Sequence, residues 1–112
     1  MDRKLEFSTR NERDTVIVDV AGQIDLETSP PMRKAALESL KGTQRLAINL
    51  TLVKYIDSSG IASLVEVLKE GRKSGKRVIL FGVTGAVLQV LQLTRLVGVF
   101  EILETEAQVL DA

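Results

Sequence analysis

The segment Asp57-Ser58-Ser59-Gly60 holds the residues of this chain that are best placed to do chemistry. An apolar stretch precedes it and an amphipathic stretch follows it, so we expect it between the end of a strand and the first turn of a helix. A helix start leaves about four N–H groups unpaired, and its dipole favours negative charge. A serine here can cap the helix, or it can carry a phosphate group with a charge of roughly −1.5 to −2.

Spacing alone leaves these two interpretations of the segment open. In the first, Asp57 or Ser58 caps the helix, Ser59 fills a polar first turn, and Gly60 lets the helix pack closely on a sheet. In the second, a serine is phosphorylated, and the phosphate displaces a docked partner through its bulk, its desolvation and its repulsion of acidic groups.

Composition argues against most enzymatic chemistry. The chain of 112 residues has no Cys and no His, so it lacks thiolate ligands, disulfides and the commonest general base. Carboxylates alone can still hold Mg²⁺ or Ca²⁺, but no nucleotide-binding or catalytic motif accompanies them. We therefore expect no enzyme activity and no cofactor.

Charge and hydropathy predict a cytoplasmic protein. Lys plus Arg and Asp plus Glu number 15 each, so the formal net charge is zero and gives no general attraction to nucleic acid or to an anionic membrane. The charged start, MDRKLEF, does not resemble a signal peptide. No stretch approaches the ~20 apolar residues of a membrane-spanning helix, so we expect no direct membrane insertion and no direct contact with nucleic acid.

The elements that must position the segment begin with a predicted hairpin. Leu5 and Phe7 alternate with polar residues, a polar break covers residues 10–14, and a Val- and Ile-rich strand follows over residues 15–21 and ends at Gly22. The loop from Asp25 leads into a helix that Thr28 or Ser29 can cap and that Gly42 ends.

Strands and helices then alternate. Leu46, Ile48 and Leu50 mark one face of a strand, and Ile61, Leu64, Val65 and Leu68 give a helix over residues 58–74 its apolar face. The remaining predicted elements are a strand over residues 78–81 that is covered on both faces, a helix over 85–94, a strand near 99–102 and a short helix that a capping box opens at Thr105.

This order predicts an α/β fold in a single domain over residues 1–112. We expect a mixed sheet of four to five strands, with the N-terminal hairpin followed by parallel strands, and about four helices. In such sheets, sites form in the loops beyond the carboxyl ends of the strands, where the Asp57 segment falls.

Several segments together resemble the STAS-domain family of anti-sigma factor antagonists. Asp57-Ser-Ser-Gly-Ile is similar to the signature segment of the family, and Gly22-Gln-Ile-Asp25 is similar to its Gly-x-hydrophobic-Asp segment. Leu46-Ala-Ile-Asn-Leu resembles the strand before the signature, and residues 87–102 resemble the closing helix and strand. The resemblance spans nearly the whole chain and implies the STAS fold.

The resemblance also implies a mechanism. Ser58 stands where the family has its phosphoacceptor, so an anti-sigma factor with serine kinase activity would bind the unphosphorylated chain and then phosphorylate it, and a serine phosphatase would reset the switch. By the same resemblance, Asp57 shapes the loop and helps engage the kinase, Ser59 supports the helix start, Gly60 gives room, and Asp25 contributes to the partner surface.

The chain departs from the family pattern at two positions, and an alternative function stays open. Arg95 and Ala62 stand where family members often carry glycine. Similar domains also serve as unphosphorylated docking subunits of membrane transport complexes, including lipid ABC transporters. The apolar segment 86–100 is a candidate docking face for that role, although we expect most of it to pack as core.

Overall fold

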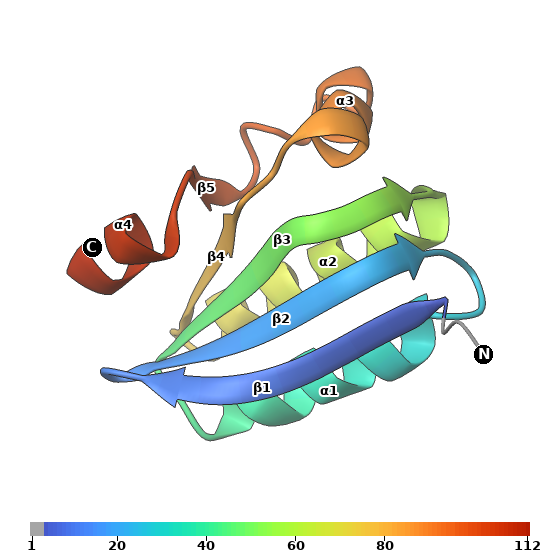
Figure 1. Cartoon of the computed structure of the whole chain (residues 1–112). Coiled ribbons are helices and arrows are strands. Elements are labelled where there is room, and N and C mark those ends of the chain that lie inside the picture. Colours follow the sequence, from blue (N-terminus) through green and yellow to red (C-terminus); the bar gives the residue numbers. More distant parts are fainter. Residues whose placement is uncertain (1–3) are drawn as a thin grey trace.

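The hairpin at the start of the chain joins strands β1 (Leu5–Glu12) and β2 (Thr15–Ile24), which pair antiparallel. In this computed structural model, which describes residues 4–112, the sheet has five strands in the order β1-β2-β3-β4-β5 (Figure 1). Strands β3 (Arg45–Ile56), β4 (Arg77–Phe81) and β5 (Glu101–Leu103) all run parallel to β2. Residues 1–3 of the predicted charged start lie outside the described part of the chain.

The helices are α1 (Ser29–Lys41), α2 (Ser58–Lys73), α3 (Gly85–Leu93) and α4 (Glu106–Asp111). In Figure 1, α1 and α2 lie behind the sheet, α3 lies beside the end of β3, and α4 lies near β4 and β5. Parallel strands require crossovers, and α1, α2 and α3 supply them. The predicted α/β class, the hairpin with parallel strands after it, and the four helices are confirmed.

Two apolar clusters hold the layers together. The larger one joins α1, α2 and α3 to one face of the sheet, and the smaller one lies on the other face, where Val109 of α4 packs with Ile17, Ala47, Ile79 and Phe81. In β4, Val78 and Leu80 belong to the larger cluster, so the prediction that this strand is covered on both faces is confirmed.

The hairpin strands are longer than predicted. Strand β1 continues through the expected polar break as far as Glu12, because its polar side chains lie at the edge of the sheet and need no burial; Arg10, for example, is paired with Asp19. Strand β2 continues past Gly22 to Ile24. At Gly22, φ is +112° and a Cβ would lie 2.3 Å from the Lys4 carbonyl oxygen, so glycine here lets β1 approach β2 closely and does not end the strand.

The apolar segment 86–100 is less buried than predicted. Only Val87, Leu91 and Phe100 are fully buried, whereas Leu93 and Val97 are 77% and 41% exposed. The reason is that α3 lies beside β3 and turns a single narrow stripe toward the core. The strand expected near residues 99–102 comes later, at Glu101–Leu103, because turns occupy the residues before it.

The starts of α2 and α4 are as predicted. Helix α2 starts at Ser58 and ends at Lys73, one residue before the expected end, with Gly75 in the left-handed region at φ +70°. Both bonds of the capping box between Thr105 and Gln108 are present. No helix within residues 4–112 has the length and apolar content to cross a membrane.

Candidate functional site

The candidate site lies where β2 and β3 end side by side. Because these strands are parallel neighbours, their carboxyl ends meet at one edge of the sheet, and the backbone N–H of Asp57 donates a 3.1 Å hydrogen bond to the carbonyl of Ile24. The loop that follows β2 carries Asp25, and the turn that follows β3 carries Asp57 to Gly60. The structure therefore brings all five predicted site residues to the same edge.

Asp57 is the cap of helix α2. Its Oδ1 accepts hydrogen bonds from the N–H groups of Ser59 (3.0 Å) and Gly60 (3.2 Å), and from the Ser59 hydroxyl (2.5 Å). The Ser59 hydroxyl, followed by the two backbone groups, holds the pKa of Asp57 below its ordinary value, while burial and the nearby Asp25 charge oppose this shift. Of the two capping residues left open by the sequence, the structure selects Asp57.

Ser58 is exposed at the first position of the helix, and its hydroxyl makes no hydrogen bond within residues 4–112. The sequence suggested that a phosphate here could use the free N–H groups of the helix start. Asp57 already occupies those of Ser59 and Gly60, so a phosphate on Ser58 would stand outside the cap and add negative charge beside a carboxylate.

Gly60 is buried where α2 meets the sheet. A Cβ at this position would lie 2.6 Å from Cγ1 of Ile56 and 2.7 Å from Cγ2 of Ile24, both closer than real Cβ atoms approach. The glycine therefore allows the first turn of α2 to sit directly on the ends of β2 and β3, and this contact sets where Ser58 emerges at the surface.

Asp25 organises the neighbouring loop. Its Oδ1 accepts hydrogen bonds from the N–H groups of Glu27 and Thr28, both at 3.0 Å. The Thr28 hydroxyl accepts from the Asp25 N–H and donates to the Gln23 carbonyl at 2.8 Å. Thr28 precedes α1, but its side chain does not cap that helix as predicted, because it is engaged in closing the loop.

Lys4 joins the site from the start of the chain, and no local pattern in the sequence pointed to it. Its Nζ lies 2.7 Å from Oδ2 of Asp25, and its carbonyl accepts a 2.8 Å hydrogen bond from the N–H of Gln23. The hydrogen bond with Lys4, aided by those from the loop, lowers the pKa of Asp25 to about 2. The part played by Thr28, unlike that of Lys4, could have been expected from the sequence, because its spacing from Asp25 is typical of side chains that close a turn.

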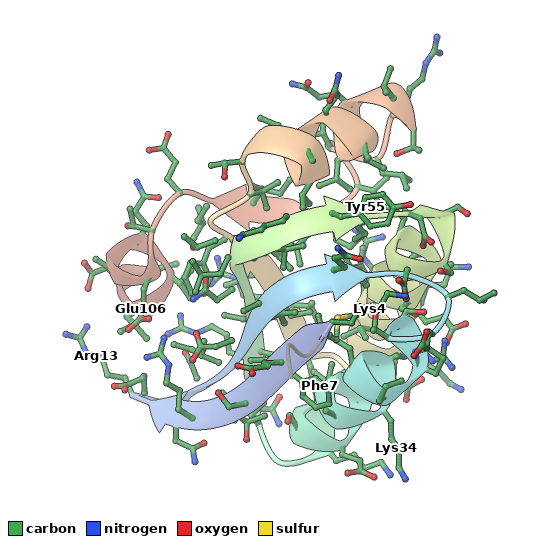
Figure 2. The ribbon with its side chains drawn as sticks, turned by 45° about the vertical axis from the view of Figure 1, so that its right-hand side comes forward. Lys4, Phe7, Arg13, Lys34, Tyr55 and Glu106 are labelled. Atoms are coloured by element: carbon green, nitrogen blue, oxygen red, sulfur yellow. The ribbon has the colours of Figure 1, made fainter. Side chains whose placement is uncertain are left out.

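A shallow depression connects the two carboxylates across the surface. It is lined by Lys4, Gln23, Asp25, Leu26, Glu27, Tyr55 and Asp57. Leu26 is 77% exposed and Tyr55 is 47% exposed, and Figure 2 shows Lys4 and Tyr55 at the same end of the sheet. Exposed apolar anchors beside fixed charges suit the binding of a protein partner. No cluster of three carboxylates that could hold a metal occurs within residues 4–112.

Comparison with known proteins identifies the class to which this fold and this site belong. The model of the STAS domain matches residues 6–109, and the chain belongs to the STAS-domain family. The chain is 34% identical over 100 residues to the anti-sigma-B factor antagonist of Listeria monocytogenes, a match that covers 87% of this chain and 88% of that protein.

Solved structures agree with this fold. A Thermotoga maritima protein proposed to be an anti-sigma factor antagonist superposes with a TM-score of 0.87 at 26% identity, covering 94% of this chain and 92% of that one. The Bacillus cell fate determinant SpoIIAA, solved in its phosphorylated form, superposes with a TM-score of 0.74 at 21% identity, covering 95% of this chain and 97% of that one. At that identity the second likeness concerns the fold alone.

Proposed function

We propose that this chain is a cytoplasmic, non-enzymatic anti-sigma factor antagonist that is switched off by phosphorylation of Ser58. In the unphosphorylated form it binds an anti-sigma factor with serine kinase activity, and a serine phosphatase restores that form. The names of the relatives support the antagonist role, and the observation that carries the switch is the exposed, unbonded hydroxyl of Ser58 at the rim of the two-carboxylate surface.

The geometry supports a switch in which phosphorylation changes binding and leaves the fold intact. The cap of α2 is made by Asp57, so the hydroxyl of Ser58 is not needed for the helix start. A phosphate on Ser58 would add roughly −1.5 to −2 charge next to Asp57, a carboxylate that already interacts with the charge of Asp25. A partner surface that matches these two carboxylates would then meet a much larger negative charge. A loss of tenfold to thousandfold in affinity requires only ~1.4 to 4 kcal/mol.

The other site residues act as positioning or contact groups in this proposal. Asp57 fixes the direction of the first helical turn, Ser59 completes that cap through its hydroxyl, and Gly60 seats the turn on the sheet. Asp25 and the exposed Leu26 form the neighbouring part of the partner surface.

The test combines phosphate mapping with binding measurements. Protein isolated from its native cells is digested and its phosphopeptides are mapped, and proteins captured on the unphosphorylated chain are identified. We expect phosphate on Ser58 and capture of a protein with kinase activity. Ser58→Asp should weaken binding of that protein at least about tenfold, or ~1.4 kcal/mol, with an unchanged circular dichroism spectrum. Ser74→Asp, at the opposite end of α2, serves as the matched control for added charge.

Two results would contradict the proposal. Phosphate that persists in the Ser58→Ala variant, located on Ser59 or Thr51, would show that the site is assigned wrongly. Absence of phosphate under every growth condition, together with capture of membrane transport proteins, would favour the alternative of a constitutive docking subunit for a lipid ABC transporter.

A further inference from the structure

Helix α4 is attached to the sheet by a single buried side chain. Of its six residues, only Val109 is buried. Val109 packs in the smaller apolar cluster, on the face of the sheet away from α1 and α2, where the partly buried Leu103 joins it. A helix this short is not stable in water by itself, so α4 depends on its contacts with the sheet.

Two ion pairs join α4 to the hairpin of β1 and β2. Arg10 of β1 pairs with Glu106 through both of its terminal nitrogens, and the bond from Nη1 to Oε2 is 3.1 Å long. Arg13, in the turn between the strands, lies 3.2 Å from Asp111. Arg10 is itself fixed by Asp19 of β2 at 2.7 Å, so the sheet presents its guanidinium to the helix in a defined position. Figure 2 shows Arg13 and Glu106 at the same end of the molecule.

A third arginine, Arg45 at the start of β3, binds the far end of α4. Its Nη1 donates a 2.6 Å hydrogen bond to the carbonyl of Ala112, the residue that caps the helix. The side chains of both ion pairs are about a third or more exposed, and the contact of Arg45 is exposed as well. Dissolved ions screen charges in such positions, so the attachment of α4 weakens as the ionic strength rises.

The residues beneath α4 form an apolar surface that the helix covers, which we call the outer patch. It consists of Ile17, Ala47, Ile79 and Phe81, of which Phe81 is 3% exposed and the others are completely buried. They belong to β2, β3 and β4, and the other face of these paired strands packs in the larger cluster. The strands therefore keep their pairing and one covered face when α4 leaves. Local openings of this kind require less free energy than unfolding of the whole domain.

We propose that α4 is a releasable strap, which its charges hold over the outer patch and which rising ionic strength releases. Ala47 lies near the start of β3, whereas Asp57 follows the end of that strand, so the strap and the candidate site lie at opposite ends of the sheet (Figure 1). Release uncovers a second face of the molecule and leaves the candidate site in place. This response is independent of the phosphorylation proposed for Ser58.

The test is the reaction of a buried thiol with an uncharged maleimide, because the chain has no cysteine of its own. Ala47→Cys places the thiol under the strap, and Ala36→Cys, at a site in α1 that is 1% exposed, is the matched control in the larger cluster. We expect the thiol at position 47 to react at least about tenfold faster than the thiol at position 36. The ratio of the two rates should rise at least about threefold between about 20 mM and about 500 mM KCl.

Charge variants of the strap test whether charge holds it. In the Ala47→Cys chain, Glu106→Gln together with Asp111→Asn should raise the reaction rate at low salt at least about fivefold and remove most of its dependence on KCl. Glu38→Gln together with Glu70→Gln removes two negative charges from exposed positions on α1 and α2. This control pair should leave the rate within about twofold of the Ala47→Cys chain.

A measurement on the unmodified chain decides the question if Ala47→Cys does not fold. The N–H of Val109 donates a 3.2 Å hydrogen bond to the carbonyl of Thr105 while α4 is formed. Its hydrogen exchange should accelerate at least about threefold over the same range of KCl, relative to the N–H of Leu64 in α2.

Two results overturn the proposal. Equal reactivity of the two thiols would show that α4 leaves only when the whole domain unfolds. A reactivity at position 47, or an exchange rate of the Val109 N–H, that does not change with KCl would show that charge does not hold the helix.

Discussion

At the scale of single residues, the Asp25 carboxylate is bound from two sides. One oxygen accepts N–H groups of its own loop, and the other pairs with the Lys4 ammonium at 2.7 Å. The loop bonds are local, but the ion pair links the start of β1 to the loop that we propose as part of the partner surface. Removal of the Lys4 side chain therefore tests how far this ion pair from the edge of the sheet lowers the pKa of Asp25.

We expect Lys4→Ala to raise the pKa of Asp25 from about 2 toward the ordinary value of about 3.9, without reaching it, because the loop N–H groups remain. The folded-state pKa lies below the unfolded one, so the bound carboxylate favours folding above about pH 4, and this contribution disappears as the pH falls toward 2. Titration of the carboxyl carbon by NMR measures the change. Lys34→Ala on α1 is the control, and an identical midpoint in both variants would contradict the role of Lys4.

At the scale of elements, the end of α3 explains one departure from the family pattern. The N–H of Leu96 donates a 2.9 Å hydrogen bond to the carbonyl of Leu91. The N–H of Arg95 donates a 3.1 Å hydrogen bond to the carbonyl of Gln92. This pair of bonds is typical of a helix ending in which one residue adopts the left-handed conformation. That residue is Arg95, with φ +60°. Glycine adopts this conformation without strain, which would account for the glycine expected here from the family resemblance, and the exposed Arg95 side chain is compatible with the same helix ending.

Arg95→Gly should raise the free energy of unfolding by up to about 1 kcal/mol. The left-handed conformation costs a residue with a Cβ roughly 1–2 kcal/mol, and the greater freedom of glycine in the unfolded chain offsets part of the gain. Arg95→Ala removes the same side chain but keeps the Cβ, so it should give no gain. Denaturant unfolding monitored by circular dichroism compares the two, and equal stabilities would contradict the backbone explanation.

At the scale of the whole molecule, α2 links the candidate site to the core. Its first turn rests on Ile24 and Ile56 through Gly60, and its apolar face continues into the larger cluster, so the position of Ser58 depends on how the helix sits on the sheet. A change at this contact should affect stability and site geometry together.

Gly60→Ala should lower the free energy of unfolding by about 1–3 kcal/mol, because the new methyl group overlaps side chains of two buried strands. It should also weaken partner binding, because the displaced turn carries Ser58. Gly98→Ala is the control, since a Cβ there meets nothing within 4 Å. Denaturant unfolding and partner titration measure the two effects, and a Gly60→Ala variant as stable as Gly98→Ala would show that the contact tolerates a side chain.

The sequence by itself determined the order of the elements and the α/β class, and it singled out the Asp57 segment as the candidate site. These follow from local causes: the apolar periodicity of α2, the capping box at Thr105, and the polar turn after an apolar strand. The residues of the Asp57 segment are neighbours in the chain, so their joint position at a helix start needs no tertiary information.

Only the tertiary structure decided what joins that segment from elsewhere. Lys4 reaches Asp25 because β1 pairs with β2, and the exposure of Leu93 and Val97 follows from where α3 lies beside β3. The choice of Asp57 over Ser58 as cap also depended on a side-chain direction that both residue types allow. Strand pairing and packing bring together residues that are far apart in the chain. Local sequence patterns do not show which of these distant residues become neighbours.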